Sequence, residues 1–455
     1  LRVKGMRGLM LVAEDEAGLS ILQPEWVSDA SAGQGAIAGM AFEMALPDAF
    51  AFAARVTVKG LPAGLRYNAT TRLITGVPTK SGTFVVTISA PGVATQTITL
   101  SVEALPAWAW GSFSGFTDGG RVASMSVSAQ GKVSGKLVVN GTNYTFTATS
   151  FAAGGSARDG FLVSTVAKAG RTTFPLKLLV SHPSGAAAAS LGVADGLFNE
   201  ALRLLLYRNV WKEEKSLLAP YVGYYTASLP GGSGYGSAYL TLTVDAAGKV
   251  KTAGKLADGT GLSLSGPLLL DGSGRVFVVI YGAPTGYKGG FLFGLAEFVK
   301  PAAGRVFLRL LDDALFVWQS RNPLATSVYG EGFARQTGLV GGWYDKIGNL
   351  YDYYRDAVLT AGSDAGAPAP ELTVQGVRVA SALWRPDGAA LTVVANASGV
   401  MTGLQGPPKS AASGDDDDDD ESERTVELTI SLTRATGIFK RSEERRVGKE
   451  CRSRW

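Results

Sequence analysis

The stretch YLTLTVDAAGKVKTAGKL, residues 239–256, decides the fold because it contains the signals of one complete β-hairpin. Apolar residues alternate with threonine as far as Val244, which is the two-residue period of a strand with one buried face. Gly248 marks a tight turn, and a second strand candidate follows it. A related stretch, VASMSVSAQGKVSGKL, fills residues 122–137, where Gly131 matches Gly248 at an offset of 117 residues. The chain therefore contains an internal β repeat.

Further pairs of motifs set the size of this repeat. LYRNVW at 206–211 matches WQSRNP at 318–323, and GGWYD at 341–345 echoes VGYYT at 222–226. A weaker third copy of the hairpin is ALTVVANASGVMTGL at 390–404. We therefore expect three β repeat units, placed at 105–218, 219–337 and 338–440.

Each unit contains about eight short strand candidates joined by turn signals. In the second unit they lie near residues 221–228, 238–245, 249–256, 260–270, 274–282, 290–298, 304–312 and 313–320. Sequential strands of this kind form antiparallel meanders, which lose their exposed edges by closing into a barrel or by splitting into two sheets. The runs PLLLDG at 267–272 and VFVVIYG at 276–282 are apolar on both faces, so we expect neighbouring units to pack on them.

Residues 24–104 precede the repeats and predict a β-sandwich of seven or eight strands. In VTVKGLPAGLRYNATTRLITGVPTKSGTFVVTISA, residues 56–90, alternating runs are separated by turns at Pro62, Asn68 and Pro78. TQTITLSV at 95–102 repeats the alternation and would complete the sheet. We therefore expect an all-β chain, in which a sandwich is followed by tandem antiparallel barrel-like or sandwich units.

The turn residues of the sandwich carry a resemblance to a known family. The matching motifs are GLPAGL at 60–65, LITGVPT at 73–79 and GTF at 82–84. With them, residues 24–104 resemble the immunoglobulin-like repeat of bacterial surface proteins, which is related to the dystroglycan-type cadherin-like domains. The resemblance implies an extracellular spacer or interaction module, without calcium because the acidic motifs of true cadherins are missing here. The later units resemble, more loosely, β repeats found beside such domains in exported bacterial proteins.

The last fifteen residues, RSEERRVGKECRSRW at 441–455, have no hydrophobic pattern and resemble a translated sequencing adapter. Six of the 43 basic and three of the 39 acidic residues lie there, which leaves 37 basic and 36 acidic residues and a formal charge of +1. That balance gives no clustered basic surface, so we expect no nucleic-acid partner. We expect this tail to stay outside any folded unit, residues 1–23 to be a remnant of a preceding domain or linker, and the sequence to be a fragment.

Composition points to the cell exterior. The only cysteine, Cys451, lies in the tail, so disulfides and thiolate metal sites are not expected. No run of 18 apolar residues predicts a membrane-spanning helix, and the strand candidates are short for the about 9–11 residues of a spanning strand. We expect an extracellular or cell-surface location, although the apolar run at 8–12 is too short for a signal sequence.

Candidate site residues are few. His182 is the only histidine, and its position before Pro183 favours a turn over a catalytic or metal-binding role. The run Asp415–Asp420 predicts a solvated loop because like charges repel, with loose cation binding left open. An aromatic group at 343–354 could bind a sugar or a protein, or could pack into a core instead. Its members are Trp343, Tyr344, Tyr351, Tyr353 and Tyr354.

No catalytic constellation accompanies these residues, so we expect neither an enzyme nor a cofactor. The interpretation favoured by the repeats is a non-enzymatic fragment of a large exported or cell-surface bacterial protein that acts in adhesion or as structural spacer and interaction modules. Its ligand would be a protein or a polysaccharide at the cell exterior. The alternative is a carbohydrate-binding accessory region of a secreted polysaccharide-degrading enzyme, supported only by the aromatic group.

Overall fold

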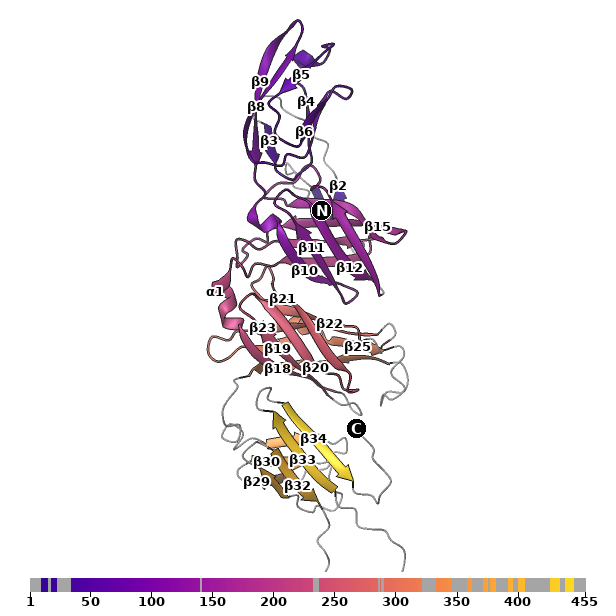
Figure 1. The fold of residues 1–455 in the computed structure, drawn as a ribbon, viewed down its shortest axis with the longest axis vertical. Helices are drawn as coiled ribbons and strands as arrows, with labels where there is room; N and C mark the ends of the chain where they lie inside the picture. Colours follow the sequence, from indigo (N-terminus) through magenta and orange to yellow (C-terminus); the bar gives the residue numbers. More distant parts are fainter. Residues whose placement is uncertain are drawn as a thin grey trace, which may run out of the picture.

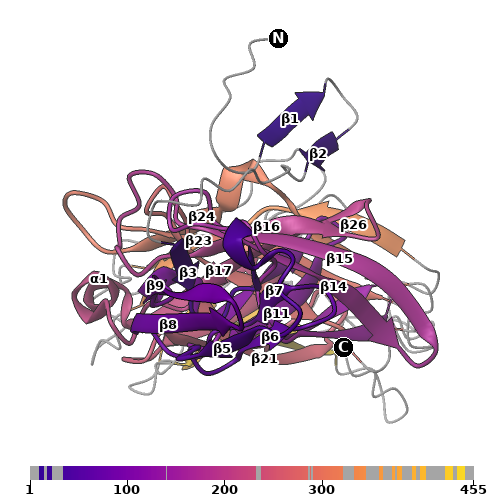
Figure 2. The ribbon, with the colours of Figure 1, turned by 90° about the horizontal axis from the view of Figure 1, so that it is seen from above.

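A sandwich and two barrels are stacked along the long axis of the molecule, with smaller sheets of the C-terminal part beyond them (Figure 1). Seen down this axis, the bodies overlap (Figure 2). The structure is a computed structural model. It describes residues 35–139, 141–231, 237–284, 287, 290–320 and 333–344 in full, and outside them only the backbone of strands β1, β2 and β28–β34 and the first residue of β3. Strands β1 (Met10–Glu14) and β2 (Gly18–Leu22) form an antiparallel hairpin before the first body.

The first body is a seven-stranded sandwich. Its larger sheet has the order β3-β9-β8-β5 and its smaller sheet the order β4-β7-β6. The strands are β3 (Gln34–Ile37), β4 (Phe42–Ala45), β5 (Thr57–Lys59), β6 (Leu65–Asn68), β7 (Leu73–Gly76), β8 (Gly82–Ala90) and β9 (Val93–Glu103). Phe50, Ile74, Val86 and Ile88 are completely buried between the sheets. The predicted immunoglobulin-like sandwich is confirmed in its strand number and two-sheet core.

The second body, barrel 1, is a closed barrel of eight consecutive antiparallel strands. They are β10 (Gly111–Thr117), β11 (Arg121–Val127), β12 (Val133–Val139), β13 (Thr142–Ala148), β14 (Phe161–Ala169), β15 (Thr172–Ser181), β16 (Val193–Phe198) and β17 (Leu202–Arg208). The first strand pairs with the last, so barrel 1 has no free edge. Apolar side chains such as Phe113, Val163 and Leu206 fill its interior, whereas Ser112, Ser126 and other polar residues face outward.

The third body, barrel 2, follows a short helix, α1 (Lys215–Leu218). Its strands are β18 (Gly223–Leu229), β19 (Ala238–Val244), β20 (Lys249–Lys255), β21 (Gly261–Leu270), β22 (Val276–Gly282), β23 (Phe291–Val299), β24 (Phe307–Leu310), β25 (Phe316–Ser320), β26 (Phe333–Thr337) and β27 (Val340–Trp343). The first six positions match the strand candidates of the sequence within about two residues. The pairing of β22 with β23 closes a ring of β18–β24 and β27, and β25 and β26 form a hairpin attached to β23.

Strand β27 differs from the sequence-based division of the chain. We placed residues from 338 onward in a third unit, but β27 pairs with β18 and β24 and so completes barrel 2. Strand β17 closes barrel 1 by pairing with β10. The strand at the matching position of barrel 2, β25, pairs with β23 and β26 instead. A boundary drawn from local motifs cannot detect such an exchange, because pairing partners are chosen by the whole sheet.

The remaining strands form two small sheets. They are β28 (Val358–Ala361), β29 (Glu371–Val374), β30 (Val377–Ser381), β31 (Thr392–Ala395), β32 (Val400–Gln405), β33 (Val426–Thr433) and β34 (Ile438–Arg445). Strand β34 pairs with β33 through Arg445 and therefore includes five residues of the segment 441–455. Our expectation that this tail joins no folded unit was wrong for these residues. Backbone donors and acceptors are present in any non-proline sequence, so the ladder at 438–440 can continue into residues without a hydrophobic pattern.

Trp343 provides a test of barrel closure by β27. Replacing it with alanine should lower the free energy of unfolding by about 2–3 kcal/mol, because the partly buried indole packs against the core of barrel 2. The matched control is Val340→Ala on the same strand, since Val340 is 67% exposed and should cost less than about 0.5 kcal/mol. Urea unfolding measures both changes, and equal effects of the two substitutions would contradict closure by β27.

Candidate functional site: the joints between the domains

The sandwich is attached to barrel 1 by a backbone contact, here called joint 1, made by residues 39–41 with Gly131 and Phe151. The Phe151 N–H donates to the Gly39 carbonyl at 3.0 Å, and the Ala41 N–H donates to the Phe151 carbonyl at 2.9 Å. Met40 is buried with the core of barrel 1. These two bonds form an isolated parallel β-bridge between Met40 and Phe151 across the domain boundary, so the sandwich and barrel 1 share a buried contact in addition to the chain that links them.

Two glycines meet backbone to backbone at joint 1. A Cβ placed on Gly39 would lie 2.6 Å from the carbonyl carbon of Gln130, and one placed on Gly131 would overlap the Gly39 carbonyl. Both residues also have positive φ, at 80° and 74°, where glycine is favoured. The approach of the two domains therefore requires glycine on both sides.

Barrels 1 and 2 meet through joint 2, which consists of an apolar face and Trp211. Five buried side chains form its centre: Tyr207 on barrel 1, and Leu269, Phe277, Leu295 and Leu311 on barrel 2. The ring centres of Tyr207 and Phe277 are 5.4 Å apart, and the rings lie edge to face, which is an arrangement that aromatic pairs prefer. Leu269 and Phe277 belong to the runs that are apolar on both faces. The prediction that neighbouring units pack on those runs is confirmed.

Trp211 extends joint 2 into the interior of barrel 2. The residue follows β17 of barrel 1, is only 1% exposed and belongs to the core of barrel 2. Its indole N–H donates to the Leu268 carbonyl at 2.6 Å, which satisfies a polar group that would otherwise be costly to bury. A Cβ on Gly248 would overlap the indole ring, so glycine at this turn makes room for Trp211.

The turns that receive the two joints are equivalent in the repeat. Gly131 and Gly248 have φ values of 74° and 75°. The preceding polar residue accepts the same hydrogen bonds in each turn: Ser128 Oγ from the N–H groups of residues 130 and 132, and Asp245 Oδ1 from those of residues 247 and 249. The β-hairpin turn that reveals the repeat in the sequence is therefore also the docking point for a residue from the domain side that precedes each barrel: Gly39 of the sandwich at joint 1, and Trp211 after β17 at joint 2.

Arg208 supports the chain between the barrels. Its side chain is 4% exposed. Nε donates to the Trp110 carbonyl at 2.6 Å, Nη1 to the Ser190 carbonyl at 3.2 Å, and Nη2 to Glu213 Oε1 at 3.1 Å. A buried guanidinium is stable only when its donors are satisfied, and these bonds tie the end of β17 to both neighbouring loops. Its repeat partner Arg321 lies outside the described residues.

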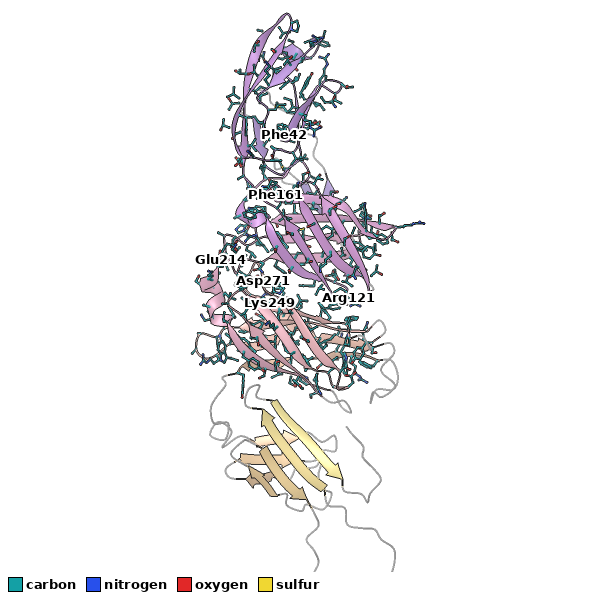
Figure 3. All side chains as sticks on the ribbon, viewed as in Figure 1. Phe42, Arg121, Phe161, Glu214, Lys249 and Asp271 are labelled. Carbon is teal, nitrogen blue, oxygen red and sulfur yellow. The ribbon has the colours of Figure 1, made fainter. Side chains whose placement is uncertain are left out.

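Charged groups surround the apolar centre of joint 2. Arg275 donates from Nε to Asp271 Oδ2 at 2.7 Å and from Nη1 to Asp312. Figure 3 shows Asp271 and Arg121 between the two barrels, where the Arg121 guanidinium lies 3.4 Å from the centre of the Phe291 ring. Burial, assisted by the charge of Asp271, raises the pKa of the Tyr207 phenol above its ordinary value. Tyr207 is therefore neutral in the folded protein over the whole neutral range.

The structure places two of the five aromatics that we considered as ligand contacts. Trp343 lies 5.4 Å from the ring of Tyr225 and packs against the core of barrel 2, and Arg305 lies over its ring at 5.2 Å. Tyr344 lies edge-on to Tyr224, with 6.0 Å between the ring centres. Tyr351, Tyr353 and Tyr354 lie outside the described residues, as does the run Asp415–Asp420. The placement of Trp343 matches the core alternative.

His182 follows β15, as expected for a residue before a proline turn. Its Nδ1 is 2.7 Å from the Leu191 carbonyl, and its ring stacks on Trp108 with the ring centres 6.0 Å apart. Among the described residues no group of three or more His, Cys, Asp or Glu side chains could hold a metal ion. In the same part of the chain, no helix is long and apolar enough to cross a membrane.

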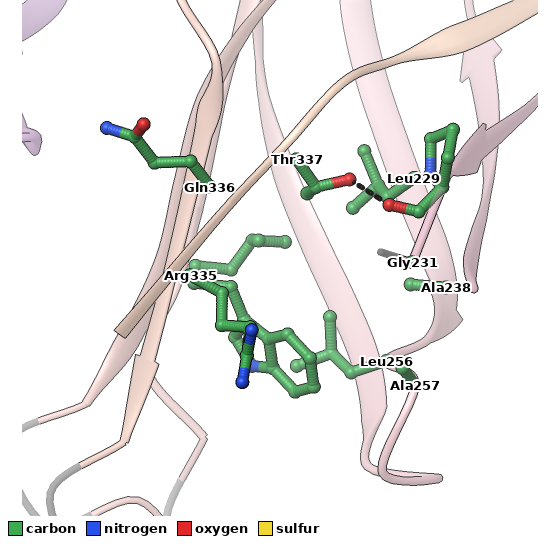
Figure 4. Close-up of a pocket in the computed structure, with 11 residues that line it drawn as sticks. Leu229, Gly231, Ala238, Leu256, Ala257, Arg335, Gln336 and Thr337 are labelled. Carbon is green, nitrogen blue, oxygen red and sulfur yellow. Dashed lines mark hydrogen bonds between the residues drawn. The ribbon is translucent and has the colours of Figure 1, made fainter. Parts of the chain in front are cut away.

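A small cavity lies under the hairpin of β25 and β26 (Figure 4). Trp318, Arg335 and Leu256 line it, and the Thr337 hydroxyl donates to the Pro230 carbonyl at its rim. Its volume of about 30 Å³ accommodates a water molecule rather than an organic ligand. We therefore assign it no ligand.

One comparison with known proteins gives a match. A family model described as "Putative Ig domain" matches residues 27–105, the segment that forms the sandwich. The predicted immunoglobulin-like domain is thereby confirmed. No curated protein matches the chain, and no solved structure does.

Sequence reasoning located the turn glycines of the joints but not their partners. Gly131 and Gly248 were found as repeat positions, whereas Gly39 and Trp211 have no repeated counterpart at the same spacing. The placement of Trp211 after a strand, in LYRNVW, was the only available signal of its role. That signal is weak, because a tryptophan at a strand end more often packs within its own domain.

Alanine substitutions at the turn glycines test the joints. Gly131→Ala and Gly248→Ala should each destabilise the protein by about 2–4 kcal/mol, because the positive φ and the overlap with Gly39 or Trp211 add together. Gly141→Ala and Gly259→Ala are matched controls, since these glycines have φ of 77° and 83° with nothing within 4 Å of the added Cβ. The controls should cost only about 1–2 kcal/mol. Equal losses in urea unfolding would contradict the close approach at the joints.

Alkaline pH should weaken joint 2 through Tyr207. Because the pKa of the phenol is raised in the folded state, its stabilising contribution is complete below the unfolded pKa of about 10 and is lost as pH rises above it. The unchanged chain should lose stability between about pH 9 and pH 11. Tyr207→Phe should lose less over the same interval, as measured by urea unfolding. An identical pH dependence of the two proteins would contradict burial of a neutral phenol at this joint.

Proposed function

We propose that the chain is a non-enzymatic part of a large exported or cell-surface protein, in which it serves as a rigid spacer that carries interaction modules, including modules for adhesion. The observation that carries this proposal is that the turn glycine of each barrel packs against a residue that comes before the barrel in the chain, Gly39 of the sandwich on Gly131 and Trp211 on Gly248. Linked domains move relative to each other by default unless their interface is extensive and apolar. Here joint 2 has a buried apolar centre, and joint 1 has a β-bridge beside the buried Met40; both contacts oppose relative movement of the domains, as a spacer requires.

The immunoglobulin-like match supports the interaction role and an extracellular location, since domains of this kind commonly serve outside the cell. A spacer places its binding surfaces at a fixed distance from the anchor, and a stiff array loses less conformational entropy when it engages a partner. The partner would be a protein or a polysaccharide at the cell exterior.

The alternative, a carbohydrate-binding accessory region, has less support. It depends on exposed aromatic rings at 343–354, and the one indole of that group packs against the core of barrel 2. A sugar-stacking platform needs a ring with a free face, whereas Trp343 has Tyr225 at its edge and Arg305 above it. We therefore favour the spacer.

Rigidity can be measured by the distance between two spin labels. With Cys451→Ser as background, labels at Thr97→Cys in the sandwich and Lys251→Cys in barrel 2 should give a single narrow distance distribution. The control pair is Lys251→Cys with Lys300→Cys, both within barrel 2. A spacer predicts similar widths for the two pairs. A distribution several times broader for the pair that spans the joints would argue for flexibly linked domains and against the proposal.

A further inference from the structure

A second, larger cavity lies between the barrels, beside the apolar centre of joint 2. Its volume is about 280 Å³. One wall is the outward face of β10–β13 of barrel 1, and the other is formed by β21 and β22 of barrel 2. Ligand pockets for drug-sized molecules begin near 300 Å³, so this cleft has room for a molecule of about one sugar ring.

The cleft exists because two strands of barrel 2 separate. Strand β21 pairs with β22 only at Leu268–Leu270, and the pairing stops at Pro267. Proline has no N–H to donate to a ladder. Beyond it, Gly266 has no side chain, and the nearest atom to a Cβ placed there is the Val279 carbonyl oxygen at 3.9 Å. The opening is therefore encoded by the Gly266-Pro267 pair rather than left by imperfect packing.

The polar groups that line the cleft have no partner within the described residues. Ser114 and Ser124 contribute hydroxyls from barrel 1, Ser265 contributes one from barrel 2, and Asn143 contributes an amide. None of these four side chains forms a hydrogen bond in the described part of the chain. Asn143 and Ser265 are exposed and Ser114 and Ser124 are half-buried, so all four side chains are open to solvent and available to a bound molecule.

Charge narrows the class of ligand. Among the residues that the structure describes, Lys136 and the phenol of Tyr281 are the ionisable groups of the lining, and no carboxylate of these residues lines the cleft. Apolar side chains such as Val122, Leu264 and Ile280 complete the walls. A carboxylate facing Lys136, hydroxyls facing the serines and Asn143, and C–H groups facing the apolar walls would match this lining.

We propose that the cleft between the barrels binds a small hydroxylated carboxylate of the size of one sugar ring, a sugar acid, with Lys136 facing the carboxylate. The site rests on the proposed rigid joint, because its two walls belong to different barrels. The two proposals fail in different ways: a broad label distance across the joints argues against the spacer, whereas a narrow distance without saturable binding argues against the ligand site alone.

Titration of the full chain with D-glucuronate, followed by ligand-observed NMR, tests the site. Glucuronate should bind saturably, and D-glucose should bind at least about tenfold more weakly because it lacks the charge. Lys136→Gln should weaken glucuronate binding by about tenfold. Lys177→Gln, an exposed lysine on β15 away from the cleft, is the matched control and should have no effect.

A second experiment fills the cleft. Gly266→Leu projects a side chain into open space and should abolish glucuronate binding without lowering the melting temperature. If that variant fails to fold, Ser124→Leu fills the cleft from the wall of barrel 1 and should also abolish binding. Absence of saturable glucuronate binding would overturn the proposal, as would equal binding by the Lys136→Gln and Lys177→Gln variants. Equal affinity for glucose and glucuronate would overturn the assignment of a carboxylate. The label distances across the joints should be unchanged in all these variants.

Discussion

The arrangement of the domains depends on a left-handed glycine at one hairpin turn. In barrel 1 and in barrel 2 the turn between the second and third strands has a φ near 75° and no Cβ. The missing side chain leaves room for a group from outside the barrel to approach the backbone of the turn. This group is the Gly39 carbonyl in barrel 1 and the Trp211 indole ring in barrel 2. Both turns keep the same internal hydrogen bonds, so the turn has the same structure in the two barrels and only the group that packs on its glycine differs.

This constraint connects the local sequence to the shape of the molecule. A turn that needs a positive φ selects glycine for conformational reasons alone. Here the turn glycine also provides the space in which two domains meet, so adding a Cβ to it would strain the turn and also disturb the joint. The apolar face around Tyr207 and the satisfied guanidinium of Arg208 then hold the barrels in the orientation that the turn permits. Stacking of the bodies follows from these contacts (Figure 1).

Much of this fold could be predicted from local patterns. Two-residue alternation located the strands of barrel 2, and turn motifs identified the sandwich, because both signals depend only on neighbouring residues. The runs at 267–272 and 276–282 predicted an interface because a strand buried on both faces has no polar alternation. The placement of β27, in contrast, depends on competition between strands far apart in the sequence. The partners of the turn glycines, Gly39 and Trp211, were missed because neither residue has a repeated counterpart, although Trp211 ends the repeated motif LYRNVW.

Trp211 is fixed inside barrel 2, and hydrogen exchange of its indole N–H tests this most directly. If joint 2 opens only when barrel 2 unfolds, the Trp211 indole N–H should exchange as slowly as the backbone amides of Leu240 and Leu242 in the barrel core. Exchange of the indole N–H orders of magnitude faster than these amides, at a pH where the barrel remains folded, would contradict the claim. The barrels would then be linked by a contact that opens independently of the fold.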